Sequence, residues 1–210
     1  MILTHFFGAV LGLKLLDFDY NIFKILNGLA GQSHSLDVFF VIVAEGILYL
    51  IFAGIAIFIL MDKKNKERKI IALQALFAAL ISRVVFIELI RVFFFRLRPF
   101  VAGVVTQLVY HNPLEASFPS GHAAAMFAMA FTICFVSRKW GVFFLILALI
   151  SSVCRVIVGV HYPMDIVGGF LVGILSVLAA KMVFDLWVRK RLAGPSWARH
   201  SPLGLLKKRK

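Results

Sequence analysis

The stretch FPSGHAAAMFAMAFTICFVSRKWGVFFLILALISSVCRVIVGVHYPMD, residues 118–165, decides the fold of this chain. It begins with the polar turn PSGH at 119–122 and ends with a second polar group within 155–165. The residues between are almost all apolar, apart from the basic break SRK at 137–139. Two polar clusters separated by such apolar runs predict two helix ends that meet on one side of a membrane.

Composition indicates an integral membrane protein. Of the 210 residues, 61% are hydrophobic and only 16% are charged, whereas soluble domains average about 25% charged residues. In such a chain the net charge of +13 is interpreted by its position relative to the spans, and no nucleic-acid partner is expected. Cys134 and Cys154 lie inside apolar runs, so we expect two buried apolar residues rather than a disulfide or a metal site.

The predicted fold is an all-α, polytopic membrane helix bundle with about five transmembrane spans and an N-terminal interfacial helix. The predicted spans are residues 37–60, 70–95, 120–136, 141–159 and 164–187. Residues 17–31 combine apolar positions at helical spacing with polar ones elsewhere, which is typical of an amphipathic helix in the membrane interface. Residues 1–16 are apolar without the features of a removable signal peptide, and whether they form a sixth span stays open.

Three segments follow from this division: an N-terminal interfacial segment 1–35, a membrane domain 36–188 and a basic tail 189–210. Fifteen of the 23 Lys and Arg residues fall in the tail and in the loops after the first and third spans. The positive-inside rule makes that face cytoplasmic. The C-terminus is then cytoplasmic, and the other loops lie on the outer face of a bacterial plasma membrane. Arg96 lies in an outer loop, where we expect it to snorkel to the headgroups.

Three polar clusters fall at the predicted outer ends of the spans. In the first, Arg91 and Arg98 are seven residues apart, and two helical turns would place both on one face. Pro99 is expected to end that helix. Two guanidinium groups at membrane depth need an anion or water. Two alternatives to anion binding stay open: the arginines snorkel to the outer headgroups, or Arg91 pairs with Glu88 three residues earlier.

The second cluster, PSGH at 119–122, has the composition of a helix start. Ser120 can cap the helix, and Gly121 allows close approach of the backbone. The free N–H groups at such an N-terminus favour an anion. Because arginines of the other clusters would lie nearby, we predict that the anion is a phosphate group, which suits planar guanidinium donors.

The third cluster pairs a histidine with a carboxylate. Tyr162-Pro163 after His161 predicts the start of the last span, so Asp165 falls in its first turn, within reach of the imidazole. A carboxylate that fixes the histidine tautomer leaves the other ring nitrogen free to attack phosphorus. His122, on a different helix, would protonate the leaving oxygen. A lone histidine at a span end is more often a cap, but a His–Asp pair beside arginines and a second histidine favours catalysis.

These clusters resemble the three-part signature of the type-2 phosphatidic acid phosphatase superfamily of membrane lipid phosphatases. The matching motifs are Arg91-x6-Arg98-Pro99, Pro119-Ser120-Gly121-His122 and Arg155-x5-His161-x3-Asp165. This chain departs from the signature at Arg91, where the family usually has Lys, and at Cys154, where it usually has Ser. Neither change removes a group that the proposed chemistry needs.

The resemblance implies a role for each matching residue. His161 would be the nucleophile that forms a phosphohistidine, oriented by Asp165, and His122 would act first as the acid and then as the base. No metal and no other cofactor is implied. The phosphoryl oxygens would be held by Arg91, Arg98, Ser120, Gly121 and Arg155.

Outside the motifs, the chain is similar to the undecaprenyl-diphosphate phosphatase branch of the family. The resemblance rests on residues 20–24, 27–30, 36–37, 45 and 116–118. It implies hydrolysis of undecaprenyl diphosphate to undecaprenyl phosphate and phosphate at the outer face, which recycles the carrier lipid of cell-wall synthesis. Glu45, inside a span, is a second-shell candidate together with Glu88, and a purely structural role for Glu45 stays open.

Two rival functions stay open. One keeps the chemistry but changes the substrate to a glycerolipid, either phosphatidylglycerophosphate or phosphatidic acid. The other is a non-catalytic binder or transporter of anionic lipids, which would need the arginines but not His161 aligned with Asp165. The oligomeric state and the contacts of the basic tail also stay open.

Overall fold

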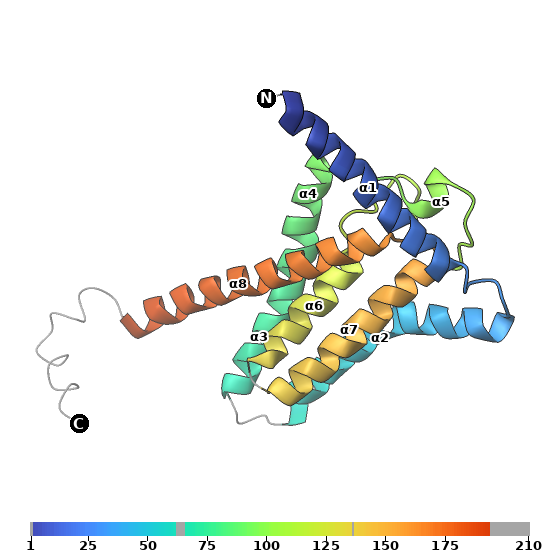
Figure 1. Ribbon diagram of the computed structural model, residues 1–210. Coiled ribbons are helices and arrows are strands. Elements are labelled where there is room, and N and C mark those ends of the chain that lie inside the picture. The colour runs from blue at the N-terminus through green and yellow to red at the C-terminus, as the bar shows by residue number, and fades with distance from the viewer. Residues whose placement is uncertain (1, 62–65, 136, 194–210) are drawn as a thin grey trace, which may run out of the picture.

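The computed structural model describes residues 2–61, 66–135 and 137–193, which form helices joined by loops (Figure 1). No strand occurs within these ranges, which confirms the all-α prediction. The elements in chain order are α1 (Ile2–Asn27), α2 (His34–Met61), α3 (Lys66–Ile81), the π-helical segment η1 (Ser82–Ile87), α4 (Glu88–Phe93), α5 (Pro99–Ala102), α6 (Gly121–Cys134), α7 (Arg138–Ile157) and α8 (Pro163–Ala193).

Four helical stretches are long and apolar enough to cross a bilayer. They are His34–Ile57, Lys69–Phe93, Arg138–Ile157 and Pro163–Leu186. The second runs without interruption through α3, η1 and α4. The remaining predicted span, residues 120–136, is the short helix α6, which at 14 residues is below the usual spanning length of about 20. The membrane-bundle prediction is confirmed, with α6 as a shorter central helix.

Helix α6 forms the centre of the bundle and packs against α3, α7 and α8. Small residues allow this close packing. A Cβ atom on Gly173 of α8 would lie 2.8 Å from the Cβ of Phe127 on α6, and one on Gly169 would lie 2.7 Å from the carbonyl oxygen of Ser120. Small residues at helix contacts are the usual device for bringing backbones together in membranes.

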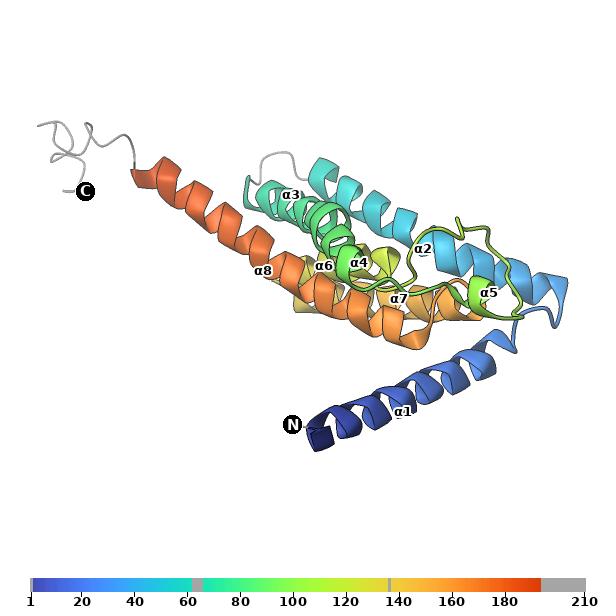
Figure 2. The same cartoon turned by 90° about the horizontal axis from the view of Figure 1, so that it is seen from above.

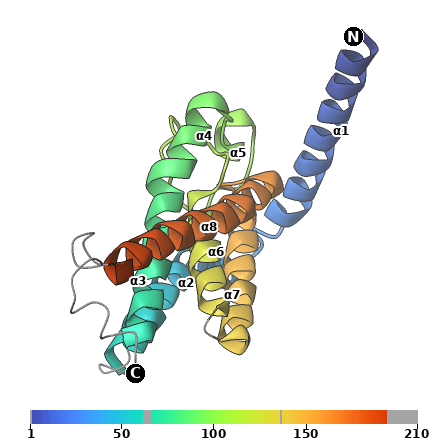
Figure 3. The same ribbon diagram turned by 90° about the vertical axis from the view of Figure 1, so that its left-hand side faces the viewer.

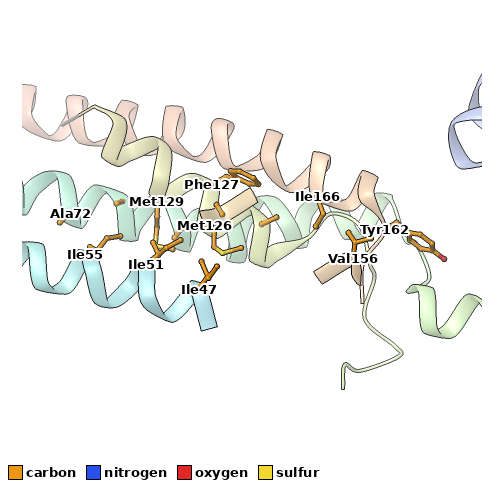
Figure 4. Close-up of a cluster of buried hydrophobic side chains, with 14 of the residues drawn as sticks. Ile47, Ile51, Ile55, Ala72, Met126, Phe127, Met129, Val156, Tyr162 and Ile166 are labelled. Atoms are coloured by element: carbon orange, nitrogen blue, oxygen red, sulfur yellow. The ribbon is translucent and has the colours of Figure 1, made fainter. Parts of the chain in front are cut away.

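The main hydrophobic core continues from α6 toward α2 (Figure 4). Ile51 and Ile55 of α2 and Met126 and Met129 of α6 are buried in it. Tyr162 marks the other end of the same cluster, next to the loop that precedes α8. The core therefore fixes the start of α6 relative to the start of α8.

Helix α1 is one continuous helix over residues 2–27, followed by a turn. The prediction of a separate helix over 17–31 was therefore wrong at both ends, because the helix extends through the apolar residues before Asp17 and stops at Asn27. Its N-terminal half leaves the bundle in all three views (Figures 1–3).

Asn27 anchors the C-terminal end of α1. Its amide nitrogen donates to the carbonyl oxygens of Thr106 and Ile157, both at 2.8 Å, and its oxygen accepts from the Thr106 N–H at 3.1 Å. One turn earlier, Phe23 is buried and its ring lies 5.2 Å from that of Tyr162. This end of α1 is thereby tied both to the end of α7 and to the loop before α8.

The last helix, α8, continues to Ala193, beyond the predicted end of the membrane domain at 188. The polypeptide therefore leaves the bundle as a helix rather than as an irregular tail. The rest of the basic tail, residues 194–210, lies outside the described residues, and so do Lys63 and Lys64 of the first basic loop.

Candidate active site

Backbone hydrogen bonds bring the three sequence motifs to one end of the bundle. The Ser117 N–H donates to the Arg96 carbonyl oxygen at 2.8 Å, and the Ser120 N–H donates to the Asp165 carbonyl oxygen at 3.0 Å. The Leu108 N–H donates to the Val158 carbonyl oxygen at 3.1 Å. These bonds join the loop after α4 to the end of α7, and the start of α6 to the start of α8. The peptide bond between Phe118 and Pro119 in this loop is cis.

His161 and Asp165 form a buried pair between α7 and α8. The imidazole Nδ1 lies 3.4 Å from Asp165 Oδ2, and both side chains are almost fully buried. Burial lowers the pKa of His161 from 6.5 to about 3, so the ring is neutral at physiological pH. With Nδ1 toward the carboxylate, Nε2 keeps the free electron pair that a nucleophile needs.

Asp165 is held by further donors. Its Oδ2 accepts hydrogen bonds from the Ser117 hydroxyl and, at 2.8 Å, from the Tyr162 N–H. Ser117 also lies 3.5 Å from His161 Nδ1. Sequence reasoning used Ser117 only as part of a family resemblance, because a serine ahead of PSGH carries no recognisable spacing signal.

Arg96 connects Asp165 to the first helix. Its Nη1 donates to Asp165 Oδ1 at 3.0 Å and its Nη2 to Asp19 Oδ2 at 2.6 Å, while its guanidinium carbon lies 3.8 Å from the ring centroid of Tyr162. The expectation that Arg96 snorkels to the headgroups was therefore wrong: it points inward, because two buried carboxylates need its charge. Asp19 was missed, and its other oxygen accepts the Met164 N–H at 2.8 Å.

Arg91 and Arg98 do not lie on one continuous helix. Helix α4 ends at Phe93, so the prediction that both project from one helical face was wrong, and a loop places Arg98. Arg98 is buried, and it donates to the Val160 carbonyl oxygen at 3.1 Å and to Glu115 at 3.3 Å. Burial lowers the pKa of this guanidinium. Arg91 lies 3.7 Å from Glu88, the predicted alternative pairing, at a distance too long for a strong bond.

Glu45 bridges two of the predicted site residues. Its Oε1 accepts from Arg155 Nη1 at 2.6 Å, and its Oε2 lies 3.5 Å from His122 Nε2. His111, which sequence reasoning missed, has its Nε2 2.8 Å from Arg155 Nη2. Burial is the main cause that lowers the pKa of His111 to about 4, so the ring is neutral and its Nε2 accepts from the guanidinium.

The N-terminus of α6 completes the site. The Ser120 hydroxyl oxygen accepts from the Ala123 N–H at 3.5 Å, as predicted for a cap. Among the described residues, four buried nitrogens around the site have no hydrogen-bond partner. They are Nε of Arg91, Arg98 and Arg155, and Nε2 of His122, whose 3.5 Å contact with Glu45 is an ion-pair distance rather than a hydrogen bond. Buried donors without partners are rare in folded proteins, and the oxygens of a phosphoryl group would satisfy such a set.

The described residues include no group of three His, Cys, Asp or Glu side chains close enough to hold a metal ion. Metal-independent chemistry stays a prediction, and activity in the presence of EDTA tests it.

Comparisons with known proteins place the chain among its relatives. Residues 71–189 match the model of the PAP2 superfamily. Undecaprenyl-diphosphatase BcrC of Bacillus subtilis is 33% identical over 159 residues, which cover 75% of this chain and 79% of the relative. An undecaprenyl-diphosphatase of Sulfolobus acidocaldarius is 28% identical over 174 residues, 82% of each protein.

Among solved structures, LpxE of Aquifex aeolicus has a TM-score of 0.61 at 24% identity, over 78% of this chain and 94% of that one. At this identity the match shows a common fold. The family model alone covers more than half of the sequence, and the Bacillus relative aligns along most of both chains. This protein therefore belongs to the PAP2 superfamily.

Proposed function

We propose that this PAP2-superfamily phosphatase hydrolyses undecaprenyl diphosphate to undecaprenyl phosphate and phosphate. The observation that carries the proposal is the neutral, buried His161, fixed by Asp165 beside unpartnered arginine nitrogens. Two relatives named as undecaprenyl-diphosphatases support the choice of substrate. The lipid substrate and the bilayer are the partners that this function requires.

In the first step, His161 Nε2 forms a bond to the terminal phosphorus, and the bond to the bridging oxygen breaks. The electron pair of that bond goes to the departing lipid phosphate. His122 donates a proton to the leaving group, and Glu45, 3.5 Å from its Nε2, stabilises the protonated ring. Arg91, Arg98 and Arg155, together with Ser120 and Gly121, hold the oxygens of the transferred group.

In the second step, water attacks the phosphohistidine while His122 accepts a proton from that water. The bond between nitrogen and phosphorus breaks, which releases phosphate and restores neutral His161. Asp165 keeps Nδ1 protonated in both steps, so the same ring nitrogen is used each time. This scheme assigns a role to every residue that sequence reasoning proposed as catalytic.

The same proposal includes a cellular arrangement. The reaction takes place at the outer face of a bacterial plasma membrane, and the C-terminus lies in the cytoplasm. Residues 36–188 form the phosphatase domain, preceded by the interfacial segment 1–35 and followed by the basic tail 189–210. The gathering of basic residues in two loops and the tail supports this orientation.

A panel of purified lipids tests the substrate. We expect the detergent-solubilised protein to release phosphate faster from undecaprenyl diphosphate than from phosphatidylglycerophosphate or phosphatidic acid, and to retain activity in EDTA. His161→Ala should abolish release from every lipid, because it removes the proposed nucleophile. His34→Ala, which changes an exposed histidine, serves as the matched control. Faster hydrolysis of either glycerolipid would reject the proposed substrate, and activity in His161→Ala would reject the mechanism.

A second comparison separates the roles of the two histidines. General acid catalysis contributes roughly 10²–10⁴-fold when the leaving group is poor. The alkoxide that leaves phosphatidic acid needs a proton far more than the phosphate that leaves a diphosphate. His122→Ala should therefore retain a larger fraction of activity on undecaprenyl diphosphate than on phosphatidic acid. Equal losses on the two lipids would contradict the assignment of His122 as the acid.

A further inference from the structure

Arg83 lies outside the three motifs, yet it carries a charge within a membrane span. It belongs to η1, the π-helical segment in the middle of the stretch Lys69–Phe93. A charged side chain inside a span is costly unless it faces a polar site. Single π-helical turns within α-helices occur frequently at functional sites. The charge indicates that Arg83 faces a polar site, and the π-helical turn is consistent with a functional one.

The guanidinium of Arg83 lies against the first residue of α6. A Cβ atom placed on Gly121 would be 2.8 Å from Arg83 Nη1 and 3.3 Å from its Cζ. Arg83 thus occupies the space that a side chain at position 121 would fill. The N-terminus of α6 already favours an anion through its free N–H groups, and Arg83 places a full positive charge beside it.

The contact with Glu88 neutralises Arg83 only in part. Arg83 Nη1 and Arg91 Nη1 lie 3.6 Å and 3.7 Å from the same oxygen, Glu88 Oε1. Charge-assisted hydrogen bonds are normally about 2.7–2.9 Å, so both contacts are loose. One carboxylate is shared by two guanidinium groups, and the side chain of Arg83 remains 49% exposed. The pair of arginines keeps a net positive charge and free donors.

The arginines of the site fall into two groups, one next to each catalytic histidine. Arg98 donates to the carbonyl oxygen of Val160, the residue before His161, whereas Arg83 lies beside Gly121, the residue before His122. His161 attacks the transferred phosphorus, and His122 serves the leaving group. We propose that Arg83 forms a subsite for the phosphate that stays on the lipid when a lipid diphosphate is cleaved, next to the proposed ligands of the transferred group. This inference rests on the proposed function.

The subsite would distinguish diphosphates from monophosphates. When the bridging P–O bond breaks, its electron pair passes to the lipid phosphate, which gains negative charge, and Arg83 stabilises that charge. A monophosphate places an alcohol oxygen and its carbon at the same position, where a guanidinium has no second phosphate to bind. Arg83 is therefore a specificity-determining residue rather than a general requirement for phosphoryl transfer.

Competitive inhibition tests the subsite without any lipid. The assay would follow hydrolysis of p-nitrophenyl phosphate by the full-length protein in detergent, with inorganic pyrophosphate or inorganic phosphate added as the inhibitor. We expect Arg83→Gln to raise the inhibition constant of pyrophosphate about 10-fold or more, the usual effect of losing a hydrogen bond to a charged group. The inhibition constant of phosphate should change by no more than about 2-fold, because a single phosphate does not reach the proposed subsite. Arg83→Lys should restore part of the pyrophosphate affinity. Arg138→Gln makes the same charge change on an exposed residue at the start of α7 and should alter neither constant.

The outcomes separate this inference from the proposed function. Equal weakening of phosphate and pyrophosphate in Arg83→Gln, or no change in either, would overturn the subsite. If wild type fails to hydrolyse undecaprenyl diphosphate while pyrophosphate affinity still depends on Arg83, the substrate is wrong and the diphosphate subsite stands. If wild type does hydrolyse undecaprenyl diphosphate, but Arg83→Gln changes the inhibition constants of pyrophosphate and phosphate equally or not at all, the function stands and the subsite is rejected.

Discussion

At the scale of single residues, Asp165 is the most heavily engaged side chain of the site. One oxygen accepts from Ser117 and from the Tyr162 N–H, and the other accepts from Arg96. These contacts leave the carboxylate one orientation, with Oδ2 toward His161 Nδ1. A nucleophile fixed in this way spends little energy on reorientation when it attacks.

The first residue-scale prediction concerns Arg96 as a positioning residue. Arg96→Gln should lower kcat about 10-fold, because hydrogen bonds to charged groups are worth about 1.5–3 kcal/mol. KM should change little, since Arg96 is bonded to Asp165 and Asp19 rather than placed among the proposed phosphate ligands. Arg96→Lys should recover part of kcat. A rise in KM with unchanged kcat, measured on undecaprenyl diphosphate, would instead place Arg96 in substrate binding.

The second residue-scale prediction concerns acid stability. In the unfolded chain His161 binds a proton below about pH 6.5, whereas in the folded protein its pKa is about 3. Between these values the unfolded state holds more protons, so stability falls as pH falls, by at most about 1.4 kcal/mol per pH unit. The unfolding midpoint of wild type in detergent should therefore drop more from pH 7 to pH 5 than that of His161→Gln. Parallel drops would show that His161 is not held neutral.

At the scale of elements, helix α1 does more than lie in the interface. Its last turns supply Asp19 to the network around Asp165, and Asn27 fastens it to the loop after α4 and to the end of α7. The site is therefore built from the N-terminal helix as well as from the elements that carry the three motifs. The two attachments are separable, because Asp19 contacts Arg96 and the start of α8, whereas Asn27 contacts backbone groups elsewhere.

This separation gives a prediction for α1. Asn27→Ala removes the side-chain bonds to Thr106 and Ile157 and leaves the buried carbonyl oxygen of Ile157 without this donor, which typically costs about 1–3 kcal/mol. We expect a lower unfolding midpoint and faster proteolysis in the turn after α1, with kcat nearly unchanged below the midpoint. Asp19→Asn should show the reverse: a lower kcat with a smaller change in midpoint. If the two variants behave alike, α1 acts only as a structural support.

The sequence predicted the elements better than the connections between them. Apolar run length was enough for the spans, and the motif spacing correctly grouped His161 with Asp165, because four residues across a helix start bring the two side chains together. Arg96 and Asp19 were not paired, since they are distant in sequence and no periodicity links them. The helical placement of Arg98 failed because α4 ends at Phe93, and residue spacing alone does not reveal that the chain leaves the helix five residues before the arginine.

At the scale of the whole molecule, the site lies at one end of the helix bundle, and the starts of α3 and α7 lie at the other. The loop from α4 to α6, with α5, covers the end where α8 begins (Figures 1 and 3). Arg138 lies at the start of α7 and Lys66 at the start of α3, both away from that loop. A bilayer would therefore separate the proposed phosphate site from these cations, and this separation makes the proposed orientation testable.

Cysteine labelling in intact cells tests the orientation. In a background with Cys134 and Cys154 replaced by Ala, Val104→Cys places a thiol at a fully exposed position in the loop after α5, and Lys66→Cys places one at the opposite end of the bundle. The positive-inside rule assigns Lys66 to the cytoplasm. An impermeant maleimide added outside should label position 104 and leave position 66 unlabelled until the membrane is permeabilised. Labelling of position 66 alone in intact cells would reverse the orientation, and the substrate phosphate would then have to be presented from the cytoplasm.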